Sequence, residues 1–589
     1  MMKRLMIFVC LLTAISISAQ NDTTISRVVT VERDFQPVIQ SAGKINQQPT
    51  ILQEELQLNP VVYSTYSAPL AVGHNIYPLQ VAETKFTPQT PLNGILEGAV
   101  GHRNTHLLFG YQLHKKKNDL NLYANHDAYW GKPGLVKDEQ SNSTIGLDYT
   151  YHFRDLDFYT NIAGNLAHWV YYTPTLRTSY GKICVGPGDG LLWNAQANVG
   201  IKSTSNNAFQ YRVQTGYVAM GEWNQVDHII NTHIDFKWTN HTHAAGINIQ
   251  VKNNFYSETV WATDDMNEPF FHLNYIPHNR HALRVEPFYE YSNNNFQLHA
   301  GINLDMNIDP FIGTDQWLSK TDKLGFAPSP NVQLAWHTQD NLFHLYANAT
   351  GSYGTAMRDK ELLYNRFSYR NETQYVAPYT PIDATIGFKL RPLKSLLLDI
   401  YGGYAWMGHY ATFVDIEQVH WMDATAIDYL IAQQEYQQWK VGGALHYHYR
   451  DIVELNVHGN YYFFRRTEPI KPVEDTEHHP VAYDRPDWDL KARLDVHIDS
   501  KWSIYSDNYF AGSRWANTSE GDKQIKPIIS LSIGGQYIIN RWLSVYLQLD
   551  DYLNRKDEVF YGFQSQGIHF LAGVKWKFNE WDKLATARV

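Results

Sequence analysis

The stretch Trp488-Asp-Leu-Lys-Ala-Arg-Leu-Asp-Val-His-Ile-Asp499 alternates apolar and polar side chains without a break. Because neighbouring side chains of a strand point to opposite faces, it predicts a strand with one apolar and one polar face. Residues 145–153, 193–201 and 296–306 follow the same pattern. Runs of about ten residues are typical of a transmembrane β-barrel wall, which separates lipid from water.

Between residues 92 and 578 we predict about 22 such strands, which would form one closed antiparallel barrel. A soluble β-sandwich is the alternative, but its strands usually run only about five or six residues. The predicted strands centre on Ile95, Phe109, Leu122, Leu147, Phe158, Ala197, Val213, Ile234, Ile249, Val285, Ile302, Leu334, Leu345, Ile386, Ile400, Leu445, Val457, Leu494, Ile504, Ile533, Leu547 and Ala572.

The connections alternate in length, as they do in outer-membrane barrels with short periplasmic turns and long extracellular loops. Connections after even-numbered strands are turns such as Arg154-Asp155, Asn293–Asn295 and Arg450-Asp451. The connection near Asn104 is short where alternation expects a long one. The even number of strands, with short turns after the even-numbered ones, predicts that both ends of the barrel lie in the periplasm. Long loops are predicted at residues 130–142, 170–191, 253–280, 307–330, 352–380, 408–438 and 465–486.

Composition agrees with a membrane wall. The chain has 589 residues, among them 40 Tyr, 17 Trp and 26 Phe, which suit the aromatic girdles at the two lipid interfaces. Its net charge of -10 comes from scattered acidic and basic residues, so the basic patch that nucleic acid requires is missing. No nucleic-acid partner is expected.

The N-terminus predicts export. Residues 1–19 combine Lys3 and Arg4, a short apolar run and small residues before a cleavage site, as a signal peptide does. Residues 20–91 are rich in proline and predict an extended periplasmic or lumenal segment. Residues 92–578 form the barrel and residues 579–589 a polar tail. Cys184 is the one cysteine left after cleavage, which rules out an intrachain disulfide.

Near the C-terminus, the stretches 550–555, 561–563 and 567–573 resemble the end of TonB-dependent receptor barrels. The resemblance implies a 22-stranded barrel in the outer membrane of a Gram-negative bacterium, surrounded by lipid and inserted by the barrel-assembly machinery. Those receptors carry a plug of about 150 residues inside the barrel. Residues 20–91 are too few for one, so we expect a plug-less variant. The segment Val28–Pro37 offers a strand that TonB could pair with.

Candidate sites are few, and we assign no catalytic, cofactor or metal residue. His446 and His448 lie two apart on the polar face of one strand, His241 and His243 have the same spacing near His233, and His478-His479 lie in a loop. A stable metal site needs three or four ligands, so polar lining is the favoured interpretation.

The aromatic residues near the loops also have two interpretations. Tyr461 to Phe464, Trp406, Tyr410 and Trp421 could stack on a ligand or form an interfacial belt, and the belt is favoured. No hydrolase motif is present, so no enzyme is expected.

The sequence thus predicts an outer-membrane receptor or transporter for an unknown external ligand. A non-transporting barrel that scaffolds surface lipoproteins, or assists membrane-protein assembly, is the alternative. An adhesin or loop-borne enzyme is a third possibility. A lumen of this width needs blocking, and residues 20–91, inward loops or a partner are expected to occupy it.

Overall fold

The computed structural model describes residues 93–578 except for several internal segments. The segments not described are 132–136, 173–175, 179–180, 184–188, 205–207, 223–224, 259–278, 310–322, 355–377, 416–428, 451, 468–481, 519–520 and 562. The predicted signal peptide (1–19), N-terminal segment (20–91) and tail (579–589) lie outside the described residues. No helix in the described part of the chain is long and apolar enough to cross a membrane.

A wall of 22 antiparallel strands closes on itself because β1 pairs with β28, from Gly94↔Phe578 to Gly101↔Leu571. The wall strands are β1 (Gly94–Gly101), β2 (Asn104–Lys115), β3 (Asn118–Gly131), β4 (Lys137–His152), β5 (Leu156–Tyr172), β8 (Asp189–Ser203), β9 (Phe209–Glu222), β10 (Gln225–Asn240), β11 (His243–Glu258), β12 (Arg280–Ser292), β13 (Phe296–Asp309), β14 (Lys323–His337), β15 (Phe343–Tyr353), β16 (Tyr379–Leu393), β17 (Leu396–Asp415), β18 (Tyr429–Tyr449), β19 (Val453–Arg466), β20 (Trp488–His497), β21 (Trp502–Ala511), β24 (Ile528–Asn540), β25 (Leu543–Asp550) and β28 (His569–Phe578).

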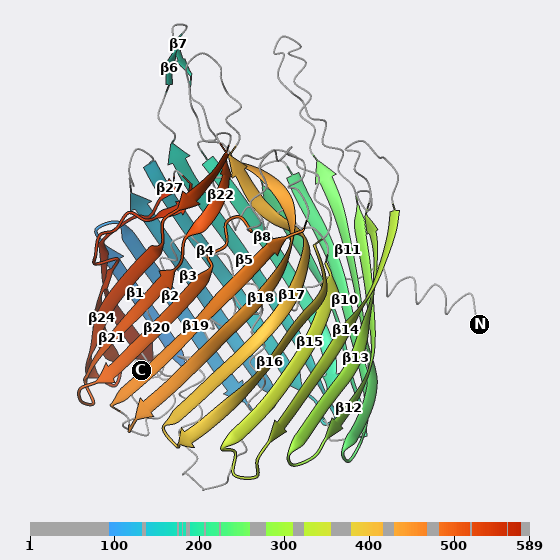
Figure 1. The fold of residues 1–589 in the computed structure, drawn as a ribbon. Helices are drawn as coiled ribbons and strands as arrows, with labels where there is room; N and C mark the ends of the chain where they lie inside the picture. The colour runs from blue at the N-terminus through green and yellow to red at the C-terminus, as the bar shows by residue number, and fades with distance from the viewer. Residues whose placement is uncertain are drawn as a thin grey trace, which may run out of the picture.

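Six short strands lie outside the wall and form hairpins at the rim of long connections (Figure 1). They are β6 (Leu176–Thr178) with β7 (Gly181–Ile183), β22 (Arg514–Thr518) with β23 (Gly521–Ile525), and β26 (Glu558–Phe560) with β27 (Phe563–Gln564). The β22–β23 hairpin joins the wall sheet through one parallel bridge, Val414↔Asn517.

All 22 predicted strand centres fall in separate wall strands, so the predicted fold class is confirmed. The wall begins at Gly94 and ends at Phe578, and the pairing of these two residues puts both ends at the rim of short turns. The strands are strongly tilted, as a closed barrel requires (Figure 1).

Several predicted loops are longer than those in the structure, because the strands continue past the apolar belt. The region 130–142 is mostly strand, since β3 runs to Gly131 and β4 begins at Lys137. In the same way, the strands cut the predicted loop 408–438 down to residues 416–428. A second exception to alternation joins β9 to β10 through residues 223–224 alone. Polar strand extensions need no apolar face, so periodicity cannot find their ends.

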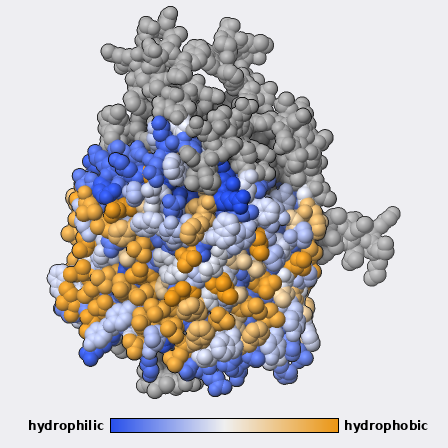
Figure 2. Space-filling view, viewed as in Figure 1, coloured by the Kyte–Doolittle hydropathy of each residue, from blue (hydrophilic) through white to orange (hydrophobic). Residues whose placement is uncertain are grey.

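The two faces of the wall differ as predicted. A broad hydrophobic band surrounds the visible side of the barrel, with hydrophilic surface above and below it (Figure 2). Ile145 is 67% exposed and Val100 64% exposed on this outer face, whereas Asp495 and Lys440 on the inner face are buried. An apolar belt around a closed sheet suits a lipid bilayer, because pairing between neighbouring strands satisfies backbone groups that lipid cannot.

Six tyrosines on the inner face each lie against a glycine directly opposite on the next strand. A Cβ at any of these glycines would lie 2.2–2.5 Å from an atom of the tyrosine side chain. Each ring therefore fills the space that the missing side chain leaves, and fixes the register of two strands. The pairs are Tyr123–Gly146, Tyr159–Gly200, Tyr346–Gly387, Tyr401–Gly442, Tyr505–Gly534 and Tyr546–Gly573.

Candidate functional site in the lumen wall

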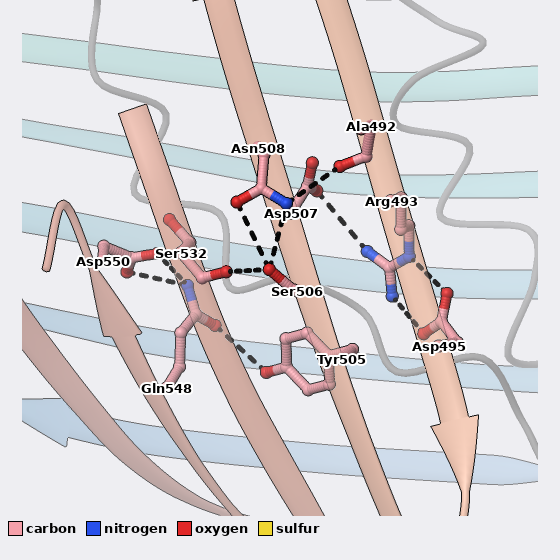
Figure 3. Close-up of polar contacts among 10 residues, drawn as sticks. All are labelled: Ala492, Arg493, Asp495, Tyr505, Ser506, Asp507, Asn508, Ser532, Gln548 and Asp550. Carbon is pink, nitrogen blue, oxygen red and sulfur yellow. Dashed lines mark hydrogen bonds and ion pairs between the residues drawn. The ribbon is translucent and has the colours of Figure 1, made fainter. Parts of the chain in front are cut away.

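The polar face of the stretch that predicted the fold lines the lumen. On β20, the Arg493 guanidinium donates to both carboxylate oxygens of Asp495, at 2.9 and 3.0 Å (Figure 3). Its third nitrogen lies 3.6 Å from Asp507 on β21, and its plane covers the Tyr505 ring at 5.4 Å. Since all three partners sit on two adjacent strands, the cation is satisfied within the wall.

The network continues across β24 to β25. The Tyr505 hydroxyl donates to Gln548 Oε1 at 3.5 Å, and Gln548 Nε2 donates to the Asp550 carboxylate at 2.8 and 2.9 Å (Figure 3). Ser506 and Asn508 alternate with these residues and so belong to the outer face. They bond to each other and to the backbone carbonyls of Ser532 and Ala492, which satisfies them there.

The closure between β28 and β1 carries a buried ion pair. Lys575 Nζ lies 3.3 Å from Glu97, whose other carboxylate oxygen is 3.9 Å from His106. His106 Nδ1 in turn lies 2.5 Å from Asp127 on β3. Charges buried in this way must be paired, and these pairs connect four consecutive strands of the closed sheet.

A similar cluster lies on the opposite arc of the wall. His299 on β13 bridges Glu286 at 3.0 Å and Glu290 at 3.2 Å, both on β12. Nearby, Arg284 donates to both oxygens of Asp305, at 2.6 and 3.1 Å. Both arcs are thus lined by charged groups of both signs that neutralise one another. A wall of this kind is hydrophilic without attracting one sign of charge.

The candidate histidines are not brought together. His446 and His448 do face the lumen, with ring centroids 6.0 Å apart, and His446 donates to Asn456 at 2.6 Å. His233 lies 2.7 Å from Asp235 in the lumen, whereas His243 contacts Tyr289 on the outer face. His478 and His479 lie outside the described residues. Among the described residues, no group of three or more His, Cys, Asp or Glu could hold a metal ion.

The candidate aromatic residues divide between the two faces. Tyr461 and Phe463 are exposed on the outer face, with rings 4.8 Å apart, as an interfacial belt requires. Tyr462 is buried on the inner face because side chains alternate along β19. Trp406 is exposed and donates to Glu435 at 3.0 Å, and Tyr410 is buried against Thr380. Trp421 lies outside the described residues.

Loops from distant parts of the chain contact one another at the rim of the long connections. We call this cluster, which contains Gln434, Arg466, Tyr483, Arg514 and Asp522, the extracellular corner. Gln434 on β18 accepts from the Tyr483 backbone N–H at 3.1 Å and donates to its carbonyl at 3.3 Å. The Tyr483 hydroxyl donates to Asp522 on β23 at 2.7 Å, and the Arg466 guanidinium covers its ring at 5.0 Å. Arg514 on β22 donates to the carbonyls of β26. These bonds join three connections of the chain, those before β20, between β21 and β24, and between β25 and β28, into one surface.

The loop after β25 contains a pH-sensitive carboxyl. Burial raises the pKa of Asp551 to about 6. Because the folded loop disfavours the carboxylate, its stability is highest at low pH, falls as pH rises through about 4 to 6, and is then constant. Asp551 has a φ of 46°, which asparagine tolerates well, so Asp551→Asn keeps the turn.

We expect Asp551→Asn to stabilise this loop by about 1–2 kcal/mol at pH 7.5, after allowing for solvent screening. Hydrogen exchange of the Tyr552 and Asn554 amides, which donate to Leu531 and Asp551, reports on it. Corrected for intrinsic rates, protection in the unmodified chain should rise about five- to tenfold between pH 7.5 and 4, and the variant should show none of this dependence. An equal dependence in both chains would contradict the assignment.

Solved structures share this architecture at very low sequence identity. The siderophore receptor PirA from Acinetobacter baumannii superposes with a TM-score of 0.60 at 9% identity, over 82% of this chain and 80% of that one. The FrpB iron transporter from Neisseria meningitidis gives 0.60 at 9% identity, over 82% and 81%. The copper transporter OprC gives 0.59 at 10% identity, over 82% and 80%.

The chain has the barrel fold of TonB-dependent receptors. Neither a protein-family model nor a curated protein sequence matches it. The resemblance seen in the C-terminal stretches is therefore confirmed at the level of fold. Within those stretches, Asn554 adopts a φ of 50° and accepts from the Ile568 N–H at 3.1 Å. This bond ties the start of the last loop of the barrel to the start of its last strand.

Proposed function

We propose that this outer-membrane barrel is a receptor and transporter that takes up an external ligand through its lumen. The observation that carries the proposal is the inner face, where charged and hydrogen-bonding groups line the arcs β20–β28 and β10–β14 and neutralise each other within the wall. A scaffold needs no hydrophilic lining of this extent, whereas a solute path does. The siderophore, iron and copper proteins of the same fold support the role but do not identify the ligand.

The second candidate function is a non-transporting scaffold for surface lipoproteins. The extracellular corner favours it, because interlocked loops offer a partner a preformed surface. In such a scaffold the lumen would stay sealed. TonB engagement by Val28–Pro37 remains a prediction, since these residues lie outside the described part of the chain.

Planar-bilayer recordings of the purified full-length chain separate the two functions. A transporter whose lumen is filled by a displaceable element should show brief, discrete openings, because its lining is hydrophilic once the element moves. A scaffold with a sealed lumen should pass no current at any voltage. Complete silence, together with an intact heat-shifted band on a gel, would contradict the uptake proposal.

A further inference from the structure

The ladder between β14 and β15 stops half-way up the wall. β14 pairs with β13 along its whole length, from Lys323↔Asp309 to Phe296↔Trp336. With β15 it pairs only from Asn331↔Thr350 to His337↔His344. Residues 323–330 therefore have a ladder on one side alone among the described residues. In a bilayer this is unusual, because backbone groups of a spanning wall are expected to pair on both sides.

Two prolines occupy the unpaired edge. Pro328 and Pro330 pair with β13 at Leu304 and Ile302, and both lie on the outer face with Phe326, which is 59% exposed. Proline lacks the N–H that a central strand donates, so it is confined to edges. The sequence of β14 is thus suited to a strand edge, and the prolines also discourage strand addition by another chain.

The end of β15 crosses to the lumen side of β14. Asn303 on β13 donates to the Gly351 carbonyl at 2.9 Å, although β14 lies between these two strands in the sheet. A Cβ at Gly351 would lie 2.4 Å from the Ser329 Cβ, so the backbone of β15 rests directly on the inner face of β14. A register shift between Thr350 and Ser352 accompanies the crossing.

Two further side-chain bonds hold this end of β15 in place. Asn307 donates to the Gly354 carbonyl at 2.7 Å, and the Tyr353 N–H donates to the Asp305 carboxylate at 3.0 Å. With the bond from Asn303, three side chains of β13 take the place of a backbone ladder between β14 and this end of β15. The upper part of the β14–β15 seam is accordingly a place where β15 can move away from β14 without breaking a described backbone ladder between them.

The lipid side and the lumen side of the seam differ in chemistry. The lipid side is apolar, with Phe326, Pro328 and Ile302 on the outer face. On the lumen side, Ser329 and Asn307 are 3% and 2% exposed, and Ser329 Oγ and Asn307 Oδ1 have no hydrogen-bond partner among the described residues. Buried acceptors without partners are costly unless a ligand or water satisfies them. A molecule that matches both sides of the seam has a polar head for the lumen side and an apolar chain for the lipid side.

We propose that the upper β14–β15 seam is a lateral port between the lumen and the outer half of the bilayer, and that it takes an amphiphile carrying an acyl chain. The chain lies along Phe326 and the prolines, and the polar head donates to Ser329 Oγ and Asn307 Oδ1. The port does not depend on uptake through the lumen. It is tested by thiol labelling and not by bilayer current, so the two proposals can fail separately.

The test uses two inward-facing alanines of β14 in a Cys184→Ser background. Ala327 lies at the seam, and Ala335 lies below it, where the ladder to β15 is intact. The probe is a dodecyl methanethiosulfonate dissolved in the bilayer of proteoliposomes. We expect Ala327→Cys to react at least about tenfold faster than Ala335→Cys, because thiol reactivity follows access. Restoring the edge donors with Pro328→Val and Pro330→Val should remove the difference.

Equal rates for the two cysteines would overturn the proposal. So would labelling of Ala327→Cys by a charged, water-soluble methanethiosulfonate alone, since that reagent arrives through the lumen. Heat-shifted migration on a gel verifies folding, and Ser329→Cys against Gln333→Cys repeats the comparison if the first pair misfolds. Lipid extraction from protein purified in mild detergent separates the sources. Co-purified lipid that the proline variant loses indicates a membrane lipid, and binding of added dodecanoate alone indicates an external amphiphile.

Discussion

Deleting residues 20–91 is expected to convert the barrel into a steadily open pore. A closed wall of 22 strands has a lumen wide enough to need an occupant, and its inner face is lined by paired polar groups that water solvates readily. The N-terminal segment is the predicted occupant, and the chain enters the wall at Gly94 on the rim of short turns, directly beside the lumen. Planar-bilayer current should change from brief openings to a continuous level.

The control for this deletion is removal of residues 579–589, which follow the last strand and should leave the current unchanged. If the chain lacking residues 20–91 folds and still passes no current, then inward loops or a partner seal the lumen. That outcome would favour the scaffold. It would leave the lateral port untouched, because lipid-soluble thiol reagents reach the seam from the bilayer.

Strand number and closure were predictable because lipid imposes a strict rule on every strand. Each wall strand must present apolar side chains at every second position, and this signal is readable one strand at a time. It correctly placed His446 and His448 toward the lumen, opposite Leu445 and Tyr447. The same rule ends where the lipid ends, so loop lengths such as 130–142 were overestimated.

What escaped prediction depends on register between strands. Tyr401 and Gly442 are about forty residues apart, and nothing in either stretch says that they lie opposite each other. His233 and His243 are close in sequence, yet the turn between β10 and β11 puts the His233 side chain in the lumen and the His243 side chain on the outer face. The seam at β14 has one sign in the sequence, the close pair Pro328 and Pro330, which the structure places in a central strand of the wall. Both prolines lie inside the predicted loop 307–330, where proline is common, so periodicity does not reveal the seam.

Gly573→Ala is expected to weaken the closure of the barrel by about 1–3 kcal/mol, the usual effect of overpacking. A Cβ at Gly573 would lie 2.4 Å from Cζ of Tyr546, so the ring must leave its place. Tyr546 packs with Ala99 and Leu571, and this small cluster joins β25, β28 and β1. Displacing the ring therefore loosens the strands on both sides of the closing pair, next to the ion pair of Glu97 and Lys575.

Gly98→Ala is the matched control for that substitution, because Gly98 lies on β1 of the same closure but faces lipid. Its nearest neighbour to a new Cβ is Leu107, at 4.0 Å, so the change should be neutral or slightly stabilising, within about 0.5–1 kcal/mol. Urea midpoints of the folded band on gels measure both variants. Adding Tyr546→Ala to Gly573→Ala should give less than the sum of the two single effects, since the clash disappears with the ring. Equal destabilisation by Gly573→Ala and Gly98→Ala would mean that strand propensity, and not the space filled by the Tyr546 ring, sets the stability of the pairing between β28 and β1.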